Sequence, residues 1–394
     1  MAGPLDGILV VDLSRALAGP HATMMLGDLG ARIVKVEAPG TGDDTRGWGP
    51  PFVGEPDALE STYFLSTNRN KESIELDLKN ESDRDVLLQL VDHADVLVEN
   101  FRTGVLERLG LGIAKLQRRN PCLVVLSITG FGHDGPEGGR AGYDQIAQGE
   151  AGLMSLTGPG PDDPQRVGVP IADLLSGMYG AYGVLAALLE RERTHVGTVV
   201  RTSLLAAVVG VHAFQGTRWS VAGEVGRAQG NHHPSIAPYG LFRCRDGAVQ
   251  IAVGSEGLWT RLVSAFELDA GGLATNADRV ADRPRVIEVV ETAFASYDAE
   301  PLLARLAEAG IPAGKVRTLD EVYSWEQVAS QGLRIEVDHA TLGNLVLPGP
   351  PLRFFAADGA EVTRTGHVAP PTLNQHSEAI RAWLSSLAVS AGMP

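Results

Sequence analysis

Short apolar runs alternate with amphipathic segments along the first half of the chain. Runs of branched apolar residues are typical of buried strands, and they occur at 8–13, 32–37, 96–98, 123–128 and 198–201. Between these runs, apolar positions recur every three or four residues, which predicts helices at 20–29, 82–93, 105–109 and 203–214. This alternation predicts an α/β fold built on a doubly wound parallel sheet. We assign residues 1–220 to this large Rossmann-like domain.

The second half of the chain has a different pattern. Residues 216–240 are rich in Gly, His, Asn and Pro and form a predicted crossover. A strand at 248–253, a helix at 258–266 and a long helix at 285–309 then predict a smaller α+β domain over 225–325. The segment 326–394 carries two short strands, at 335–337 and 345–347, and a last helix at 378–387. We expect this C-terminal segment to return to the large domain.

A further helix begins near Asp173, the only carboxylate between a proline-ended loop and a long apolar segment. Its side chain is a candidate helix cap, because Asp accepts hydrogen bonds from the open N–H groups of a first turn. It is equally a candidate nucleophile, because a carboxylate among small residues can be shielded from water. Gly177, Gly180 and Gly183 keep one helix face bare, which predicts close approach of a neighbouring backbone or a ligand.

Composition narrows the class of protein. The chain has 394 residues, 44% of them hydrophobic, with 33 basic and 48 acidic residues and a net charge of −15. We therefore expect a soluble protein with no nucleic-acid or membrane partner, because no excess of basic charge exists to neutralise phosphates. Cys122 opens a predicted buried strand and is interpreted as a core thiol, far from Cys244, so neither a disulfide framework nor a metal site is expected. Without a visible signal peptide, a cytoplasmic location follows.

Local motifs exclude some chemistries. The first strand–helix turn lacks the glycine fingerprint of dinucleotide-binding proteins, and no serine lies in a nucleophile-elbow motif. His232 and His233 are adjacent without a third ligand at metal spacing, so we interpret them as loop residues. The glycine-rich loop 130–144 follows a predicted strand and is typical of a mobile cover over a site. Basic residues near the same sheet edge form either a cationic pocket for a phosphorylated ligand or solvated surface: Arg15, Arg46, Arg69, Lys71, Lys79, Arg102 and Arg108.

Several sequence blocks together carry a resemblance to a known family. They are Pro4-Leu5-Asp6-Gly7-Ile8, Ala18-Gly19-Pro20, Val34-Lys35-Val36-Glu37, Gly42-Asp43-Asp44-Thr45-Arg46, Asn70-Lys71-Glu72-Ser73, Ala94-Asp95-Val96-Leu97-Val98-Glu99-Asn100-Phe101, Thr129-Gly130-Phe131-Gly132, Gly142-Tyr143-Asp144, Asp173 with Ser176-Gly177-Met178, Ala237-Pro238-Tyr239-Gly240 and Gly310-Ile311-Pro312-Ala313-Gly314. With them the chain resembles the family III (CaiB/BaiF-type) CoA-transferases, which include formyl-CoA transferase, along almost its whole length.

The resemblance implies a mechanism and a ligand. Asp173 takes the position of the family's catalytic Asp, whose carboxylate attacks an acyl-CoA thioester and passes through aspartyl anhydride and aspartyl-CoA thioester intermediates. Coenzyme A and its thioesters are then substrates rather than tightly bound cofactors, and no metal is needed. Backbone N–H groups at the helix start and in the glycine-rich loop would stabilise the oxyanions. The implied CoA contacts are Arg15, Leu17, Ala18, Leu76, Lys79, Asn100, Phe101, Arg102, Arg108, Ala141, Gly142 and Tyr143.

Departures from the family pattern separate the alternatives. Ala38 stands where some members have Arg, and residues 232–236 replace the glycine-rich lid of formyl-CoA transferase, which disfavours formate–oxalate exchange. The related α-methylacyl-CoA racemases use a His in the block that here contains Tyr143, a poor base at neutral pH. A transferase is therefore preferred to a racemase or to a non-catalytic CoA-binding protein. Arg15 and Arg46 suggest dicarboxylate acceptors, and the resemblance implies an interlocked homodimer.

Overall fold

The computed structural model describes residues 3–390, which group into two compact units. The large unit contains the chain up to Leu153, then Val167–Ala222, and the chain from Glu326 onward. The second unit contains Met154–Arg166 and Gly223–Trp325. The prediction had assigned residues 154–166 to the large domain, but this stretch pairs with the second unit through hydrogen bonds such as Ala228 N to Ser155 O, 2.9 Å long.

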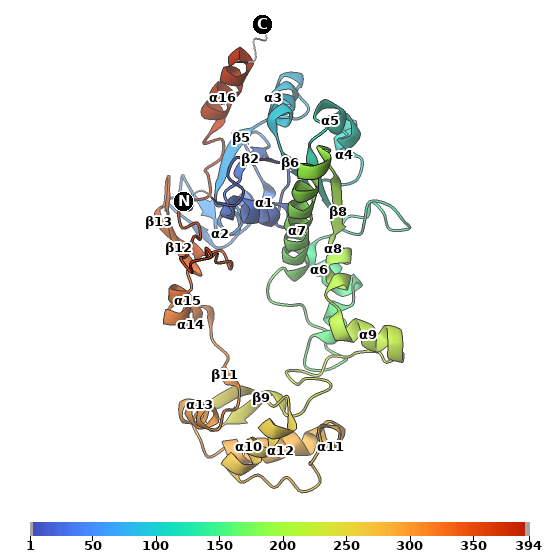
Figure 1. Ribbon diagram of the computed structural model, residues 1–394, viewed down its shortest axis with the longest axis vertical. Coiled ribbons are helices and arrows are strands. Elements are labelled where there is room, and N and C mark those ends of the chain that lie inside the picture. Colours follow the sequence, from blue (N-terminus) through green and yellow to red (C-terminus); the bar gives the residue numbers. More distant parts are fainter. Residues whose placement is uncertain (1–2, 391–394) are drawn as a thin grey trace. The chain divides into compact units, whose positions relative to one another are not determined.

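A six-stranded parallel sheet forms the centre of the large unit, which confirms the predicted α/β class (Figure 1). Its strand order is β5-β2-β1-β6-β7-β8, so the direction of winding reverses between β1 and β6. The strands are β1 (Leu9–Asp12), β2 (Arg32–Glu37), β5 (Lys71–Glu75), β6 (Val96–Glu99), β7 (Val124–Thr129) and β8 (Val199–Ser203). In open α/β sheets, ligands bind beyond the carboxyl ends of the strands at such a reversal.

Helices cover both faces of this sheet. One face packs apolar residues of alternate strand positions against α1 (Ala18–Asp28), α6 (Asp144–Glu150), α7 (Ile171–Thr194) and α8 (Leu204–Gly210). The other face packs against α3 (Glu81–His93), α4 (Val105–Arg108), α5 (Ile113–Arg119) and α16 (Ser377–Ser390). Because α16 contributes the buried Ile380 and Leu384 to this second core, the end of the described chain belongs to the large unit. Cys122 precedes β7 and is exposed, so its interpretation as a core thiol is wrong.

Short elements complete the large unit. They are η1 (Asp44–Gly47), β3 (Phe52–Val53), β4 (Glu60–Ser61), α2 (Thr62–Leu65), α9 (Ala213–Ala222), α15 (Glu326–Ser330), β12 (Arg334–His339) and β13 (Gly343–Pro348). The antiparallel pair β12 and β13 confirms the two strands predicted in the C-terminal segment. A short 3-10 turn, η2 (Leu153–Leu156), lies where the chain passes to the second unit.

The second unit has a three-stranded antiparallel sheet in the order β11-β10-β9 and its own apolar core. Its elements are β9 (Tyr239–Cys244), β10 (Gly247–Ala252), α10 (Glu256–Phe266), α11 (Asn276–Ala281), α12 (Arg283–Phe294), α13 (Ala299–Glu308), β11 (Ala313–Lys315) and α14 (Leu319–Tyr323). The single helix predicted at 285–309 is wrong, since it divides into α12 and α13. The chain turns between them, where the Asp298 carboxylate pairs with Arg245.

The bare glycine face of α7 packs against protein. A Cβ on Gly177 would lie 2.7 Å from the carbonyl oxygen of Ala18 in α1, and one on Gly183 would lie 2.6 Å from Val200 in β8. The predicted close approach is therefore confirmed, and at Gly177 the neighbour is backbone. By length and composition α7 is apolar enough to cross a membrane, alone among the described helices. Its buried face against the sheet and α1 is that of a core helix.

Candidate active site

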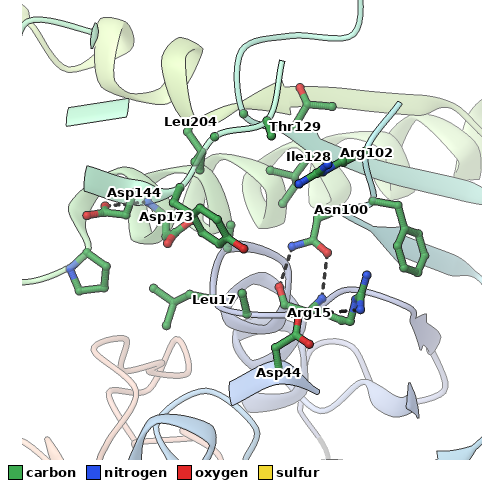
Figure 2. A pocket seen from close by; sticks show the side chains of 18 of the residues that line it. Arg15, Leu17, Asp44, Asn100, Arg102, Ile128, Thr129, Asp144, Asp173 and Leu204 are labelled. Carbon is green, nitrogen blue, oxygen red and sulfur yellow. Dashed lines mark hydrogen bonds and ion pairs between the residues drawn. The ribbon is translucent and has the colours of Figure 1, made fainter. Parts of the chain in front are cut away.

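A pocket of about 390 Å³ lies at the carboxyl end of the large sheet, where the strand order reverses (Figure 2). The loops after β1, β6 and β7 form three of its sides. The start of α7 contributes Asp173, and the segment before and within α2 contributes Trp48 and Tyr63. The volume is in the range of small-molecule sites. The parallel topology thus brings to one place side chains that are far apart in the sequence.

Asp173 is the third residue of α7 and does not cap its own helix. The residue at the cap position is Pro170, and within residues 3–390 no hydrogen bond reaches the Asp173 carboxylate. Burial, and then the negative charge of Asp144, raise the pKa of Asp173 to about 7. The side chain is therefore partly protonated at neutral pH, which is a common property of catalytic carboxyl groups. The interpretation of Asp173 as a helix cap is wrong.

Asp144, the first residue of α6, performs that capping role. Its Oδ1 accepts hydrogen bonds from the N–H groups of Ala172 at 2.8 Å and of Asp173 at 3.4 Å. These are the second and third N–H groups of α7, the ones that a cap normally satisfies. The N–H groups of Ile171 and Leu174 are bonded to the carbonyls of Val169 and Pro170. The expectation that the start of α7 offers N–H groups to an oxyanion is therefore wrong, because those groups are already occupied.

Peptide N–H groups remain open on two other sides of the pocket. In the part of the chain that the structure describes, the N–H groups of Ala141, Gly142 and Tyr143 have no acceptor. The start of α1, beginning at Leu17, has no side-chain cap either. A Cβ on Gly130 would lie 2.6 Å from the nitrogen of Gly142, so the two ends of the glycine-rich loop meet backbone to backbone. These open N–H groups can stabilise negative charge.

The loop after β1 is held in a fixed conformation. The Asn100 amide accepts a hydrogen bond from the Arg15 N–H at 2.8 Å and donates one to the Arg15 carbonyl at 2.7 Å (Figure 2). The N–H of Ala16, whose φ is +65°, donates to Asp43. The Arg15 guanidinium lies 5.2 Å from the centre of the Phe101 ring. The loops after β1 and β6 are thereby joined, with a cation and an aromatic ring at the pocket.

Most of the predicted site residues meet in this pocket. Together with Asp173 it is lined by Arg15, Leu17, Ala18, Asn100, Phe101, Arg102, Ala141, Gly142 and Tyr143. Leu76, Lys79 and Arg108 do not line it. Leu76 is only 2% exposed because it continues the edge of the sheet and packs in the core, so the implied contact of its side chain with coenzyme A is wrong. Lys79 and Arg108 are exposed outside the lining, and their implied contacts with coenzyme A stay a prediction.

Three of the seven basic residues considered for a cationic pocket, Arg46, Arg69 and Lys71, form buried ion pairs instead. Lys71 Nζ lies 3.0 Å from Asp12 Oδ2, and both side chains are fully buried. Burial lowers the pKa of Lys71 to about 8. Against the effect of burial, Lys71 and Lys35 lower the pKa of Asp12 to about 2. Arg69 likewise pairs with Asp28 and Arg46 with Glu37. The arginines left at the pocket are Arg15, Arg102 and Arg140.

Sequence reasoning did not place Trp48, Tyr63 or Asp144 in the pocket. Trp48 and Tyr63 contact each other with ring centres 5.0 Å apart, but they lie in a stretch without helical or strand periodicity. Burial, and then the charges of Asp173 and Asp144, raise the pKa of the Tyr63 hydroxyl. Asp144 belonged to a recognised block, but nothing in the sequence linked it to a helix start 28 residues away. Within residues 3–390 no group of three His, Cys, Asp or Glu side chains is placed to hold a metal ion.

The pocket lies where open α/β sheets bind ligands, and its open N–H groups and arginines suit an anionic group. The sequence profile described as CoA-transferase family III matches residues 5–377. The chain is 38% identical over 381 residues to succinyl-CoA:glutarate CoA-transferase of Mus musculus, covering 96% of this chain and 85% of that protein. It is 36% identical over 388 residues to acetyl-CoA:oxalate CoA-transferase of Acetobacter aceti, covering 96% and 95%.

The solved structures agree with the sequence comparisons. The crystal structure of a CaiB/BaiF family protein from Brucella suis matches with a TM-score of 0.85 at 38% identity, covering 98% of this chain and 100% of that chain. The chain belongs to CoA-transferase family III, as its sequence blocks indicated. Its substrates accordingly include a coenzyme A thioester.

Proposed function

We propose that this enzyme transfers coenzyme A from an acyl-CoA to a dicarboxylic acid through covalent intermediates on Asp173. The observation that carries the proposal is the position of this carboxylate, which bears no hydrogen bond among the described residues and has a pKa near 7 in a pocket of open N–H groups. The names of these relatives support the substrate class. Glutarate and oxalate are dicarboxylates, and succinyl-CoA is the thioester of a dicarboxylic acid.

The reaction consists of four displacements on three carbonyl groups, those of the donor acyl group, of Asp173 and of the acceptor acyl group. A carboxylate oxygen of Asp173 attacks the thioester carbonyl, the C–S bond breaks, and CoA thiolate leaves a mixed anhydride. The thiolate attacks the aspartyl carbonyl and releases the donor acid, which gives an aspartyl-CoA thioester. The acceptor carboxylate then displaces the thiolate to form a second anhydride. The thiolate finally attacks the acyl carbonyl of that anhydride, giving the new acyl-CoA and the free Asp173 carboxylate, with no net proton change.

The pocket offers groups for each charged species. The open N–H groups of Ala141, Gly142 and Tyr143 suit the tetrahedral oxyanions. Arg102 and the Arg15–Phe101 pair suit the phosphates and adenine of coenzyme A. Arg46 is committed to Glu37 and does not line the pocket, so it is not free to bind a distal carboxylate.

Proton transfer at the α-carbon fits this pocket less well. A racemase needs a base on each face of the substrate, and the pocket lining, all within the described residues, contains no histidine. The predicted preference for a transferase is therefore kept. Incubating the enzyme with a 2-methylacyl-CoA in D₂O tests the alternative, and rapid uptake of deuterium at the α-carbon would favour the racemase.

Mass spectrometry of the intact enzyme tests the proposal directly. Wild-type enzyme incubated with a panel of acyl-CoAs should gain the mass of an acyl group or of coenzyme A, and peptide mapping should place it on Asp173. Asp173→Asn should gain neither mass and should lose exchange, while still binding coenzyme A. An exchange rate in Asp173→Asn equal to that of wild type would exclude the covalent mechanism.

We also propose that the enzyme is a homodimer, as the family resemblance implies. Helix α9 contains no buried residue in the single chain, and its large apolar side chains are open to solvent. Trp219 is 60% and Val221 is 84% exposed. On α7, Tyr182 and Leu189 are 72% and 71% exposed. Apolar surfaces of this kind mark interaction sites. Light scattering should give twice the chain mass, and Leu189→Asp with Trp219→Asp should reduce it to one chain mass.

A further inference from the structure

Two side chains of α6 form a clamp on the start of α7. Gln148 is fully buried, and its Oε1 accepts the N–H of Val167 at 2.9 Å. Its Nε2 therefore faces Asp144 and donates to Oδ2 at 2.7 Å. The other oxygen of Asp144 accepts the N–H groups of Ala172 and Asp173. Since every partner of Asp144 is a donor, the position is built for an acceptor on both oxygens, which is a carboxylate.

This clamp changes the electrostatics of the first turn of α7. A helix start normally stabilises a nearby carboxylate through its open N–H groups and the positive end of its dipole. Here Asp144 occupies those N–H groups and adds a negative charge beside Asp173 (Figure 2). The N–H groups of this first turn are therefore not available to stabilise the Asp173 carboxylate. Burial, and then the charge of Asp144, raise the pKa of Asp173, and the occupied N–H groups leave no helix-start hydrogen bond to lower it.

Other titratable groups near the start of α7 do not offset this charge. Burial lowers the pKa of His21 on α1 to about 4, so it is neutral at working pH. Tyr63 on α2 is a neutral phenol whose pKa is raised. Helix α8 (Leu204–Gly210) has no titratable side chain. The remaining charges on packed elements or at the pocket are Asp28 of α1, which pairs with Arg69, Glu150 of α6, Arg201 of β8, and Arg15, Asp44, Arg102 and Arg140.

We propose that Asp144 is a positioning residue that fixes Asp173 and destabilises its ionised resting form relative to its acylated forms. The inference rests on the proposed covalent reaction. Asp173 is negatively charged before attack, whereas its anhydride and thioester are neutral at the aspartyl carbonyl. Repulsion by Asp144 is therefore present in the resting enzyme and relieved on acylation. No bond to Asp144 forms or breaks, and its own charge does not change.

The test compares two variants at these positions. Asp144→Asn removes the charge but places an amide nitrogen against that of Gln148. In the double variant Asp144→Asn/Gln148→Glu the match is restored, because the introduced carboxylate accepts hydrogen bonds from both the introduced amide and the N–H of Val167. It also retains one negative charge, one side chain farther from Asp173. Asp134→Asn, an exposed carboxylate in the preceding loop, is the control for loss of one charge.

Two measurements should respond. In ¹³C-carboxyl NMR of unliganded enzyme, with the Asp173 signal identified by its absence in Asp173→Asn, Asp144→Asn should lower the Asp173 titration by about one pH unit. The acidic limb of kcat/KM should move by the same amount. The covalent adduct at a fixed acyl-CoA concentration should fall about tenfold. The double variant should show smaller shifts of the same sign, and Asp134→Asn none.

The outcomes separate this inference from the proposed function. If wild-type enzyme exchanges coenzyme A but both variants titrate as wild type does, the inference is overturned and the function stands. If wild-type enzyme forms no adduct, the covalent function fails, while the NMR titration still decides whether Asp144 controls Asp173. If Asp144→Asn does not fold, the double variant, which keeps every hydrogen bond, decides by the same titration. A merely structural role would lower activity without moving either titration.

Discussion

Replacing Asp173 with Asn should stabilise the protein at alkaline pH while it abolishes exchange. The native state raises the pKa of Asp173 from 3.8 to about 7 through burial and the charge of Asp144. Between these two values the folded protein binds a proton that the unfolded chain has released. Stability from this group is therefore fully present below pH about 4 and is lost as the pH rises to about 7. Asn carries no charge at any pH and avoids this loss.

The size of the stabilisation follows from the pKa of Asp173 in the unfolded and in the folded chain. The interval between them corresponds to about 4 kcal/mol at roughly 1.4 kcal/mol per pH unit. Water entering from the pocket reduces this effect, so we expect about 2–4 kcal/mol above pH 8. For a chain of 394 residues the entropy of unfolding is roughly 0.8 kcal/mol/K, which converts the gain to about 3–5 °C in Tm.

Thermal unfolding at pH 5 and pH 8.5 provides the assay. The Tm difference between Asp173→Asn and wild type should be roughly a third of its full value at pH 5 and should reach its full value at pH 8.5. Asp57→Asn, at an exposed turn, is the matched control and should leave Tm unchanged at both values. A variant that is no more stable than wild type at pH 8.5, or equally stabilised at both, would refute the idea that ionised Asp173 is destabilised.

Three further substitutions test the packing and the pocket. Gly177→Ala should lower Tm despite the better helix propensity of Ala, because the new methyl group meets a carbonyl oxygen at 2.7 Å, whereas Gly257→Ala in open space should stabilise by up to about 1 kcal/mol. Lys71→Met should destabilise by about 3–5 kcal/mol in urea unfolding by leaving Asp12 buried and unpaired, and Asp12→Asn in the same chain should recover part of the loss. Asn100→Ala should raise KM for acyl-CoA about tenfold with a smaller change in kcat, since two hydrogen bonds hold the first loop.

The sheet was largely predictable from the sequence, because buried strands of a parallel sheet are continuous apolar runs. The exception is β5 (Lys71–Glu75), whose sequence is mostly polar. Lys71 is buried there only because Asp12 on another strand neutralises it. Nothing local in the sequence indicates a pair formed across 59 residues. For the same reason neither alternative for the basic residues, a cationic pocket or solvated surface, describes Arg69, which has its partner in Asp28.

The site was predictable in part. The carboxyl-edge loops could be expected to meet, since parallel strands end at one edge and the order of winding reverses there. The state of Asp173 could not, because it depends on which residue satisfies the N–H groups of α7. That residue is Asp144, which is placed by the tertiary packing of α6 and not by local sequence. The implied contact of Leu76 with coenzyme A was wrong, because matching a position along the sequence to a family does not tell in which direction the side chain points.

The contact between Gly177 and the Ala18 carbonyl limits how this pocket can change during evolution. Asp173 is one helical turn before Gly177, and Ala18 lines the same pocket, so two walls are joined through a contact that contains no rotatable side-chain bond. Any larger residue at Gly177 would move Asp173, the proposed nucleophile, relative to the first loop. New acid specificities are therefore expected to arise from Trp48, Tyr63 and Tyr143 on the other walls, while the α1–α7 side stays constant.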